Sequence, residues 1–342
     1  MPSVFLGVVA IAIVAGFFNG AFVLPLRYAR NWGWENTWLV FSCFSLILLP
    51  WMAAFIFVPH LPSLLQGAPL AYFLPGLIAG SFWGVSLVLY GLGLDMLGIA
   101  VGNAVVASMS ATAGTLGPLI VYAPDKLLTS TGLVLIAAIV LIVSGIYTYG
   151  KAGARKERET AGQQVSTPRI RGSFRAGLTI CLISGCLGTV FIYGIGSSTG
   201  LLRATEAAGT NPVFVGCVPM AVTFSVGFIA NLIYCLYRLR QNRTFARFTN
   251  SGNFVRNTLL AFSMAAMWVL ALLLYGAAAA KMGRLGPSVG FSLFVSGTIL
   301  FANFLGWRAG EWKGASPSTV RDFVKGMILV VIAIFAIAFG VH

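Results

Sequence analysis

Charged side chains are scarce in this sequence. Asp, Glu, Lys and Arg make up only 9% of the 342 residues, only eight residues are acidic, and there are two histidines. Soluble domains usually carry about 25% charged residues, whereas 58% of this chain is hydrophobic. The composition therefore excludes an ordinary soluble domain and predicts a chain embedded in a membrane.

Sequence motifs of enzymes are also missing. The five cysteines lie in apolar segments with neither a CxxC pair nor a Cys/His cluster, so we predict no disulfide and no metal site. The chain lacks a GxxxxGK[ST] phosphate-binding loop and shows no nucleophile–base or zinc signature. We therefore expect a protein that is not an enzyme, holds no cofactor and does not use ATP.

What the sequence has instead is ten apolar segments, each about as long as a helix that crosses a bilayer. Helices suit lipid because they satisfy their own backbone hydrogen bonds, which open strands cannot do. The predicted fold class is an all-α integral membrane protein with ten transmembrane helices. The expected spans are 3–24, 37–58, 70–92, 99–122, 131–149, 176–199, 213–237, 257–280, 286–306 and 323–341.

A basic linker, residues 151–175, separates five spans from five. If this linker is cytoplasmic, that side collects 18 of the 22 Lys and Arg: two before the second span, seven in the linker, five before the eighth span and four around the start of the tenth. Cytoplasmic loops retain positive charge. We therefore expect an inner (plasma) membrane protein with both termini outside, whose net charge of +14 reflects orientation in the bilayer rather than a nucleic-acid partner.

The two halves share a weak repeat. The pattern W-x6-YG-x6-G occurs at Trp83-Tyr90-Gly91 and again at Trp268-Tyr275-Gly276, and LG-x-x-VG follows each copy. With five spans in each half, a duplication places the second half in the membrane upside down. The sequence thus predicts two inverted five-helix repeats, 1–150 and 176–342, an arrangement that many secondary transporters use.

Aromatic and amide side chains inside the spans are the candidate substrate ligands. Trp83 and Tyr90 are two helical turns apart, as are Trp268 and Tyr275, so each pair lies on one helix face. Such rings pack on sugar faces or simply on neighbouring helices. Polar residues in spans tend to face an interior pathway. The predicted substrate-binding residues are Trp83, Tyr90, Asn103, Asn231, Trp268 and Tyr275.

Other polar residues inside the spans are weaker candidates. The amides Asn19 and Asn303 belong with Asn103 and Asn231, while hydroxyls can bond to their own helix backbone. These hydroxyl residues are Ser110, Thr112, Thr115, Ser225, Ser292 and Ser296. Together with the few charges, this set favours a neutral, polyhydroxylated solute.

Proton coupling has few candidates in this chain. Coupling requires a titratable group that reaches the pathway, yet every carboxylate lies near or beyond a span end. Glu35 and Glu206 are the predicted coupling residues, although each is also explained as an interfacial charge.

Several short motifs resemble the L-rhamnose–proton symporter family, within the drug/metabolite transporter superfamily. The similarity extends over nearly the whole chain, through Pro25-Leu26-Arg27, Trp32-Gly33-Trp34-Glu35, Leu49-Pro50-Trp51, Trp83-Gly84, Glu206-Ala207-Ala208, Asn231, Met267-Trp268 and Tyr275. The resemblance implies ten helices in two inverted halves, an inner-membrane location and uptake of a deoxy sugar with a proton.

Two other functions remain open on the sequence alone. The first is a carrier of the same superfamily that exports a small amphipathic solute, and the second is a membrane scaffold that transports nothing. A homodimer is also possible, because the spacing of Gly16 and Gly20 suits helix packing within one chain or between two.

Overall fold

The computed structural model describes residues 2–97, 99–160, 174–250, 252–310 and 312–340, and within these ranges all regular structure is helical. Ten helical stretches there are long and apolar enough to cross a membrane, which confirms the predicted number of spans. Their bounds are Phe5–Tyr28, Trp34–Phe57, Leu70–Leu94, Val101–Tyr122, Ser130–Lys156, Arg175–Ser197, Cys217–Gln241, Phe254–Lys281, Gly283–Arg308 and Pro317–Phe339.

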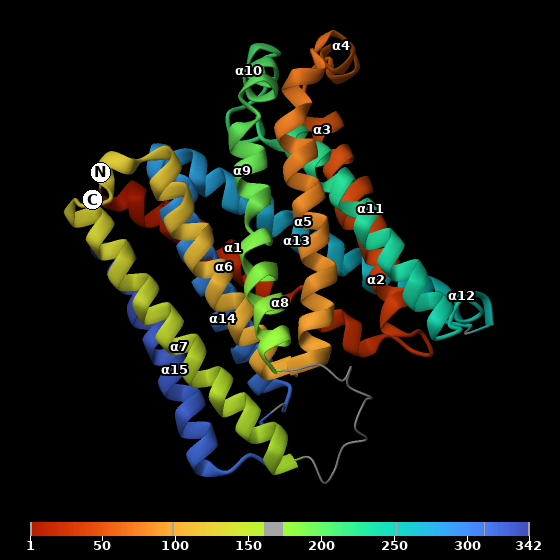
Figure 1. Cartoon of the computed structure of the whole chain (residues 1–342). Coiled ribbons are helices and arrows are strands. Elements are labelled where there is room, and N and C mark those ends of the chain that lie inside the picture. The colour runs from red at the N-terminus through yellow and green to blue at the C-terminus, as the bar shows by residue number, and fades with distance from the viewer. Residues whose placement is uncertain (1, 98, 161–173, 251, 311, 341–342) are drawn as a thin grey trace.

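Figure 1 shows the helices as a tilted bundle in which several spans consist of more than one segment. The first half contains α1 (Pro2–Ala21), η1 (Leu24–Tyr28), α2 (Trp34–Ser42), η2 (Cys43–Leu48), α3 (Leu49–Phe57), α4 (Leu61–Gly67), α5 (Leu70–Leu97), α6 (Ile99–Tyr122), η3 (Pro124–Lys126) and α7 (Ser130–Thr160).

The second half also combines long helices with short helical segments. It contains α8 (Phe174–Leu187), α9 (Val190–Ser197), α10 (Thr199–Ala207), α11 (Cys217–Gln241), α12 (Arg247–Asn250), α13 (Phe254–Lys281), η4 (Gly283–Leu285), η5 (Gly286–Gly290), α14 (Phe291–Arg308) and α15 (Pro317–Gly340). Most of the predicted linker lies outside the described residues, but its first part continues α7 as helix to Thr160.

Two of the spans contain a π-helical turn beside a proline. The turn η2 lies directly before Pro50, and η5 contains Pro287. Proline cannot donate a backbone hydrogen bond, and its ring crowds the carbonyl four residues earlier. In the second span the wider π turn accommodates the Pro50 ring without ending the helix. Pro287 stands at the start of η5, where its missing N–H is not needed. π-Helical turns are frequent at functional sites, so the second and ninth spans are candidate locations for a functional site.

Glycines set the closest helix–helix contacts. A Cβ at Gly16 would lie 2.7 Å from the carbonyl oxygen of Phe294, and one at Gly20 would lie 2.8 Å from the amide nitrogen of Ala302. Lipid provides no hydrophobic driving force between helices. Close packing of the backbones therefore stabilises the helix contact instead. The face that carries Gly16 and Gly20 therefore packs against α14 within this one chain.

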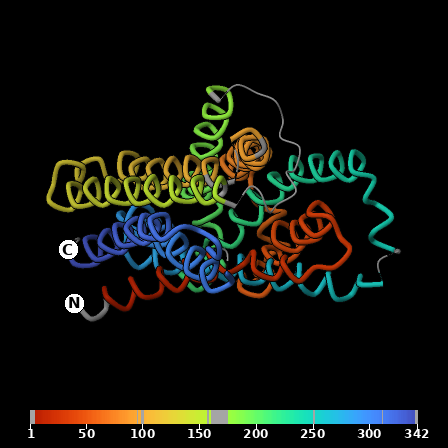
Figure 2. The backbone as a smooth tube through the Cα atoms, turned by 90° about the horizontal axis from the view of Figure 1, so that it is seen from below, coloured from red at the N-terminus to blue at the C-terminus, as the bar shows by residue number. Residues whose placement is uncertain are grey.

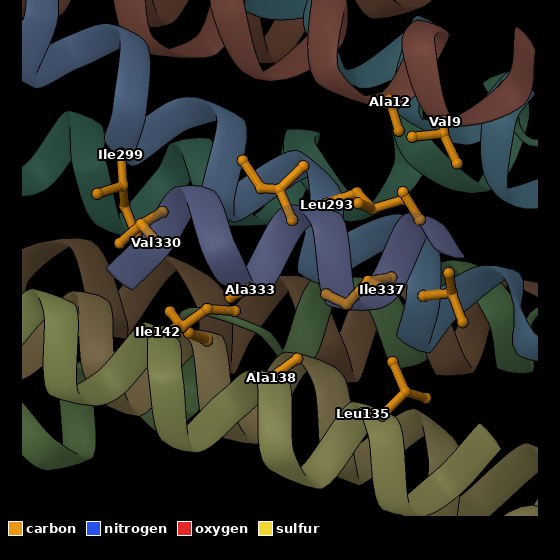
Figure 3. Close-up of a cluster of buried hydrophobic side chains, with 14 of the residues drawn as sticks. Val9, Ala12, Leu135, Ala138, Ile142, Leu293, Ile299, Val330, Ala333 and Ile337 are labelled. Atoms are coloured by element: carbon orange, nitrogen blue, oxygen red, sulfur yellow. The ribbon is translucent and has the colours of Figure 1, made fainter. Parts of the chain in front are cut away.

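The pair α7 and α15 is the most extensive contact in the bundle, and Gly145 meets Gly326 where the two helices cross. Around this crossing lies a large cluster of buried apolar side chains. Figure 3 shows part of it, from α1, α7, α14 and α15. The core residues labelled there are Val9, Ala12, Leu135, Ala138, Ile142, Leu293, Ile299, Val330, Ala333 and Ile337.

Polar contacts hold the end of α7 to the start of α15. The Ser316 backbone N–H donates to Glu159 Oε2 at 2.8 Å, and the hydroxyls of Ser316 and Thr319 donate to Oε1. The backbone hydrogen bond from Ser316 is the main reason why the pKa of the Glu159 carboxyl lies below its ordinary value. The Ser316 and Thr319 hydroxyls and Arg155 add to this effect against a small opposing effect of burial.

The bundle has two ends. The end where α7 ends and α8 begins is named the linker end, and the end where α4 and α10 lie together, at the top of Figure 1, is named the far end. Seen from below, α7 and α15 lie on one side of the molecule, and α2, α11 and α12 lie on the other (Figure 2). The spans between these two sides carry most of the candidate functional residues.

Candidate functional site

The two predicted tryptophans meet in the centre of the bundle. The ring centroids of Trp83 on α5 and Trp268 on α13 are 6.2 Å apart, and the rings are inclined by only 17°. Phe224 lies against both, at 5.0 Å from Trp83 and 5.2 Å from Trp268. Phe191 approaches Trp83 edge-on. We call these four residues the central aromatic cluster, and it joins residues from both halves of the chain.

The close approach of Gly227 fixes the position of Trp83. A Cβ at Gly227 would lie 2.5 Å from the Trp83 ring, so only glycine lets the indole pack against α11. Tyr275 belongs to the same core but lies farther along α13, where its ring contacts Phe291 and Phe294. Three of the six predicted substrate residues, Trp83, Trp268 and Tyr275, are therefore brought into one region.

A second group is polar and lies in the half of the bundle nearer the linker end. The Tyr90 hydroxyl donates to Asn103 Oδ1 and joins α5 to α6. Tyr149 on α7 interacts with the Asn303 side chain on α14 and lies near Tyr90. Tyr90 is 36% exposed, and the other three are half-buried. These four residues, the polar group, present hydroxyls and amides from four different spans. The sequence indicated all of them except Tyr149.

Asn231 is separate from both groups. Its Oδ1 accepts a hydrogen bond from Trp38 Nε1 at 3.2 Å, and its Nδ2 donates to the Ser42 hydroxyl. Both partners lie on α2, while Asn231 lies on α11 and is only 2% exposed. In this conformation Asn231 joins the second span to the seventh, and its amide is engaged on both sides.

The two predicted coupling carboxylates differ sharply in environment. Glu35, at the start of α2, is 4% exposed, and its Oε1 accepts hydrogen bonds from the Thr244 hydroxyl and from Asn242 Nδ2. Arg238 adds a favourable charge. Glu206 is exposed on α10, outside the candidate spans. Only Glu35 is thus a buried acid, and it lies where α2 meets the loop after α11.

Some hydroxyls inside the spans are satisfied and others are not. Ser110 donates to the Gly185 carbonyl, while Thr112 and Ser225 donate to carbonyls of their own helices. The buried hydroxyls of a second set have no hydrogen-bond partner among the described residues. Each unsatisfied group costs about 1–3 kcal/mol. Nine hydroxyls of the described residues belong to this set, and four of the serine and threonine hydroxyls among them lie on α6, η5 and α14. We call these four, Thr115, Ser288, Ser292 and Ser296, the hydroxyl seam.

Among the described residues, no group of three or more His, Cys, Asp or Glu side chains could hold a metal ion. The chemistry that the bundle offers is therefore that of aromatic faces, amides and hydroxyls. Such groups bind a small neutral solute by stacking and hydrogen bonding.

The fold and these groups define a polytopic helical membrane protein with aromatic and hydroxyl-rich elements between its two halves. The sequence matches the L-rhamnose-proton symport protein family over residues 2–342, and the chain belongs to that family of transporters. The family assignment agrees with the expectation that the chain is not an enzyme.

Three relatives illustrate the distance within the family. An L-rhamnose-proton symporter of Mannheimia succiniciproducens is 25% identical over 326 residues, which cover 93% of both chains. The L-rhamnose-proton symporters of Shigella dysenteriae serotype 1 and Escherichia coli K12 are 23% identical over 325 residues, again 93% of both chains. The resemblance seen in the short motifs is thereby confirmed along the chain.

Proposed function

We propose that this protein is a secondary transporter that takes up a neutral deoxy sugar such as L-rhamnose together with a proton, by alternating access. The observation that carries the proposal is the family match over residues 2–342, together with relatives named L-rhamnose-proton symporter that align over 93% of the chain. The site chemistry agrees, because it is aromatic, neutral and rich in hydrogen-bonding groups.

An inverted repeat is part of the proposal, and the pattern of helix contacts supports it. If each span corresponds to the one five places later, α1 with α13 corresponds to α8 and α9 with α5, and both contacts exist. Likewise, α1 with α14 corresponds to α8 with α6, and both pairs pack. The pair α7 and α15 corresponds to itself. A two-fold relation between the halves accounts for all of these contacts at once.

The proposed orientation follows from charge. Alternation of the ten spans assigns 18 of the 22 basic residues to the same side as the linker, so we place that side in the cytoplasm and both chain termini outside. In this orientation the polar group lies toward the cytoplasm, and the helices α4 and α10 face the outside.

We propose that the sugar binds between the central aromatic cluster and the polar group. Trp83 and Trp268 provide flat faces for the apolar side of the ring, while Tyr90 and Asn103 bind its hydroxyls. Replacing Tyr90 by Phe removes one hydroxyl and is expected to raise the KM for the sugar about tenfold, within the range for losing one hydrogen bond. The melting temperature should change little, because the Asn103 amide that loses its partner is only half-buried.

Asn231 provides the contrast for that test. We expect Asn231→Ala to reduce uptake as well, but with a lower melting temperature, because it leaves Trp38 Nε1 without its partner. Initial rates in vesicles and thermal unfolding in detergent separate the two effects. Normal uptake by both variants would contradict this assignment.

For coupling we propose Glu35, the buried acid of the two candidates, with Glu206 as the comparison. Glu35→Gln is expected to abolish accumulation driven by a proton gradient but to preserve exchange of labelled for unlabelled sugar across the membrane. That combination indicates a lost proton step rather than a lost sugar site. Glu206→Gln should keep both activities, since Glu206 is exposed outside the spans.

The experiment that tests the function uses the purified protein in lipid vesicles. Labelled L-rhamnose should accumulate under an inward proton gradient and should equilibrate without one. Equilibration alone in both conditions would make the protein a facilitator. If labelled rhamnose does not enter, while amphipathic solutes do, the function is export or uptake of another cargo.

A further inference from the structure

An exposed ion pair joins the far ends of α6 and α14. Arg284 Nη2 lies 2.6 Å from Asp125 Oδ1, and Arg284 Nε donates to the Tyr122 carbonyl at 3.1 Å. Asp125 lies in η3, directly after α6, and Arg284 lies in η4, directly before η5 and α14. The pair therefore connects the fourth span of one half to the ninth span of the other.

This pair is charged at neutral pH. Partial desolvation raises the pKa of the Asp125 carboxyl. The hydrogen bond from Arg284, a backbone donor, and the charges of Arg284 and Lys126 outweigh it, so the pKa lies below its ordinary value. This shift favours the ionised carboxylate that pairs with Arg284.

The hydroxyl seam belongs to the same two spans as the ion pair. Ser288, Ser292 and Ser296 are four residues apart and occupy one strip of η5 and α14. On one side of the strip lies Phe291, whose ring occupies the space where a Cβ of Gly114 would be. Both η5 and α14 pack against α6. The strip therefore begins in the segment that contacts α6.

Thr115 directly follows Gly114, the residue of α6 that leaves room for the Phe291 ring, as Ser292 directly follows Phe291. The seam serines and Thr115 are all 0% exposed, and their hydroxyls have no partner in the described part of the chain. Buried hydroxyls without partners disfavour the closed packing seen here, whereas apolar side chains would favour it.

Burial differs between the two ends of this helix pair. Residues 288–294 of η5 and α14 are all buried, and so are Gly114, Thr115, Pro118 and Leu119 of α6. Toward the linker end, α6 residues 105–110 are half-buried on every side, and α14 is partly exposed beyond residue 299. The structure is thus closed at the far half of the pair and looser at the linker half.

We infer that the hydroxyl seam is the far half of the solute pathway, closed in this conformation and latched by Asp125 and Arg284. When the latch opens, α6 and α14 separate, and Thr115 and the three serines meet water or sugar hydroxyls instead of each other's helices. This inference rests on the proposed transport function, because only a carrier needs the far half to open.

Thiol accessibility tests the inference without relying on sugar transport. In a background without the five native cysteines, Ser292→Cys and Ser296→Cys are each exposed to a membrane-impermeant methanethiosulfonate added at the far side. We expect both to react slowly in the closed protein and up to about fivefold faster when Arg284→Gln removes an exposed ion pair. Asp125→Asn should have the same effect and serves if Arg284→Gln does not fold.

Two controls define the outcome. Thr223→Cys is equally buried, but the Thr223 hydroxyl bonds to the Pro219 carbonyl, and we expect no reaction there. Lys281→Gln removes a far-end charge that has no ion pair with a described residue and should not change the rates. If Ser292→Cys and Ser296→Cys stay unreactive in the latch variants, the inference is wrong. If they react but no rhamnose enters, the inference about the far half of the pathway is supported and the proposed cargo is wrong.

Discussion

Two helix pairs join the fifth span to the tenth and the fourth span to the ninth, and they are built differently. The pair α7 and α15 packs through buried apolar side chains and through Gly145 against Gly326, and it is joined by polar contacts at its linker end. The pair α6 and α14 carries four buried hydroxyls without described partners and is held at its far end by one exposed ion pair.

The difference indicates that the two helix pairs have different roles. Apolar helices that pack closely through glycines have one favourable arrangement. Separating them in lipid loses these contacts and gains no hydrogen bonds. Buried hydroxyls without partners form hydrogen bonds when water reaches them. Opening a helix contact that contains such hydroxyls therefore lowers their free energy. In our account α7 and α15 hold the halves together, and α6 and α14 move. Substitutions in each pair test that contrast, beginning with the largest expected effect.

Enlarging the glycine crossing should damage the static pair most. A Cβ at Gly145 would already lie 2.7 Å from the Gly326 carbonyl oxygen, so Gly145→Leu forces α7 from α15. We expect a loss of about 3 kcal/mol or more, seen as a fall in melting temperature by fluorescence-detected size exclusion. Gly276→Leu is the matched control, because nothing lies within 4 Å of a Cβ there. Equal losses in both variants would refute the special role of this crossing.

Removing the hydroxyls of the moving pair should have the opposite effect on stability. Replacing Ser288, Ser292 and Ser296 together by Ala removes three unsatisfied groups, and we expect stabilisation of about 1 kcal/mol or more. Transport should slow, because the closed seam is then favoured. Ser198→Ala, which removes a hydroxyl bonded to the Gly194 carbonyl, should give no stabilisation. A triple variant that is less stable and transports normally would contradict the contrast between the pairs.

The smallest expected effect concerns pH and the end of α7. The Glu159 carboxyl has a depressed pKa in the folded protein, chiefly because the Ser316 backbone N–H donates to it. Its contribution to stability is therefore complete above the ordinary pKa of a glutamate and is lost as the pH falls through the lower, folded value. Glu159→Gln should flatten the acid side of the melting-temperature profile. An unchanged profile would show that this contact adds nothing.

Much of the fold could be predicted from the sequence, because each span is a continuous apolar run whose length alone indicates a helix. The site could be predicted only in part. Trp83 and Trp268 were selected by a repeat, but their contact joins residues far apart in the chain and depends on Gly227. The hydroxyls of Thr112 and Thr115 are chemically alike, and only the packing of α6 decides that one is satisfied and the other is not.

The most direct test compares a cross-link across each pair in the cysteine-free protein. Asp125→Cys with Arg284→Cys bridges the far end of α6 and α14, and Glu159→Cys with Ser316→Cys bridges α7 and α15, each joined by a reducible bifunctional thiol reagent. We predict that the first cross-link stops sugar exchange until it is reduced, while the second leaves exchange intact. Full exchange with the 125–284 cross-link complete would contradict the claim that α6 and α14 must separate.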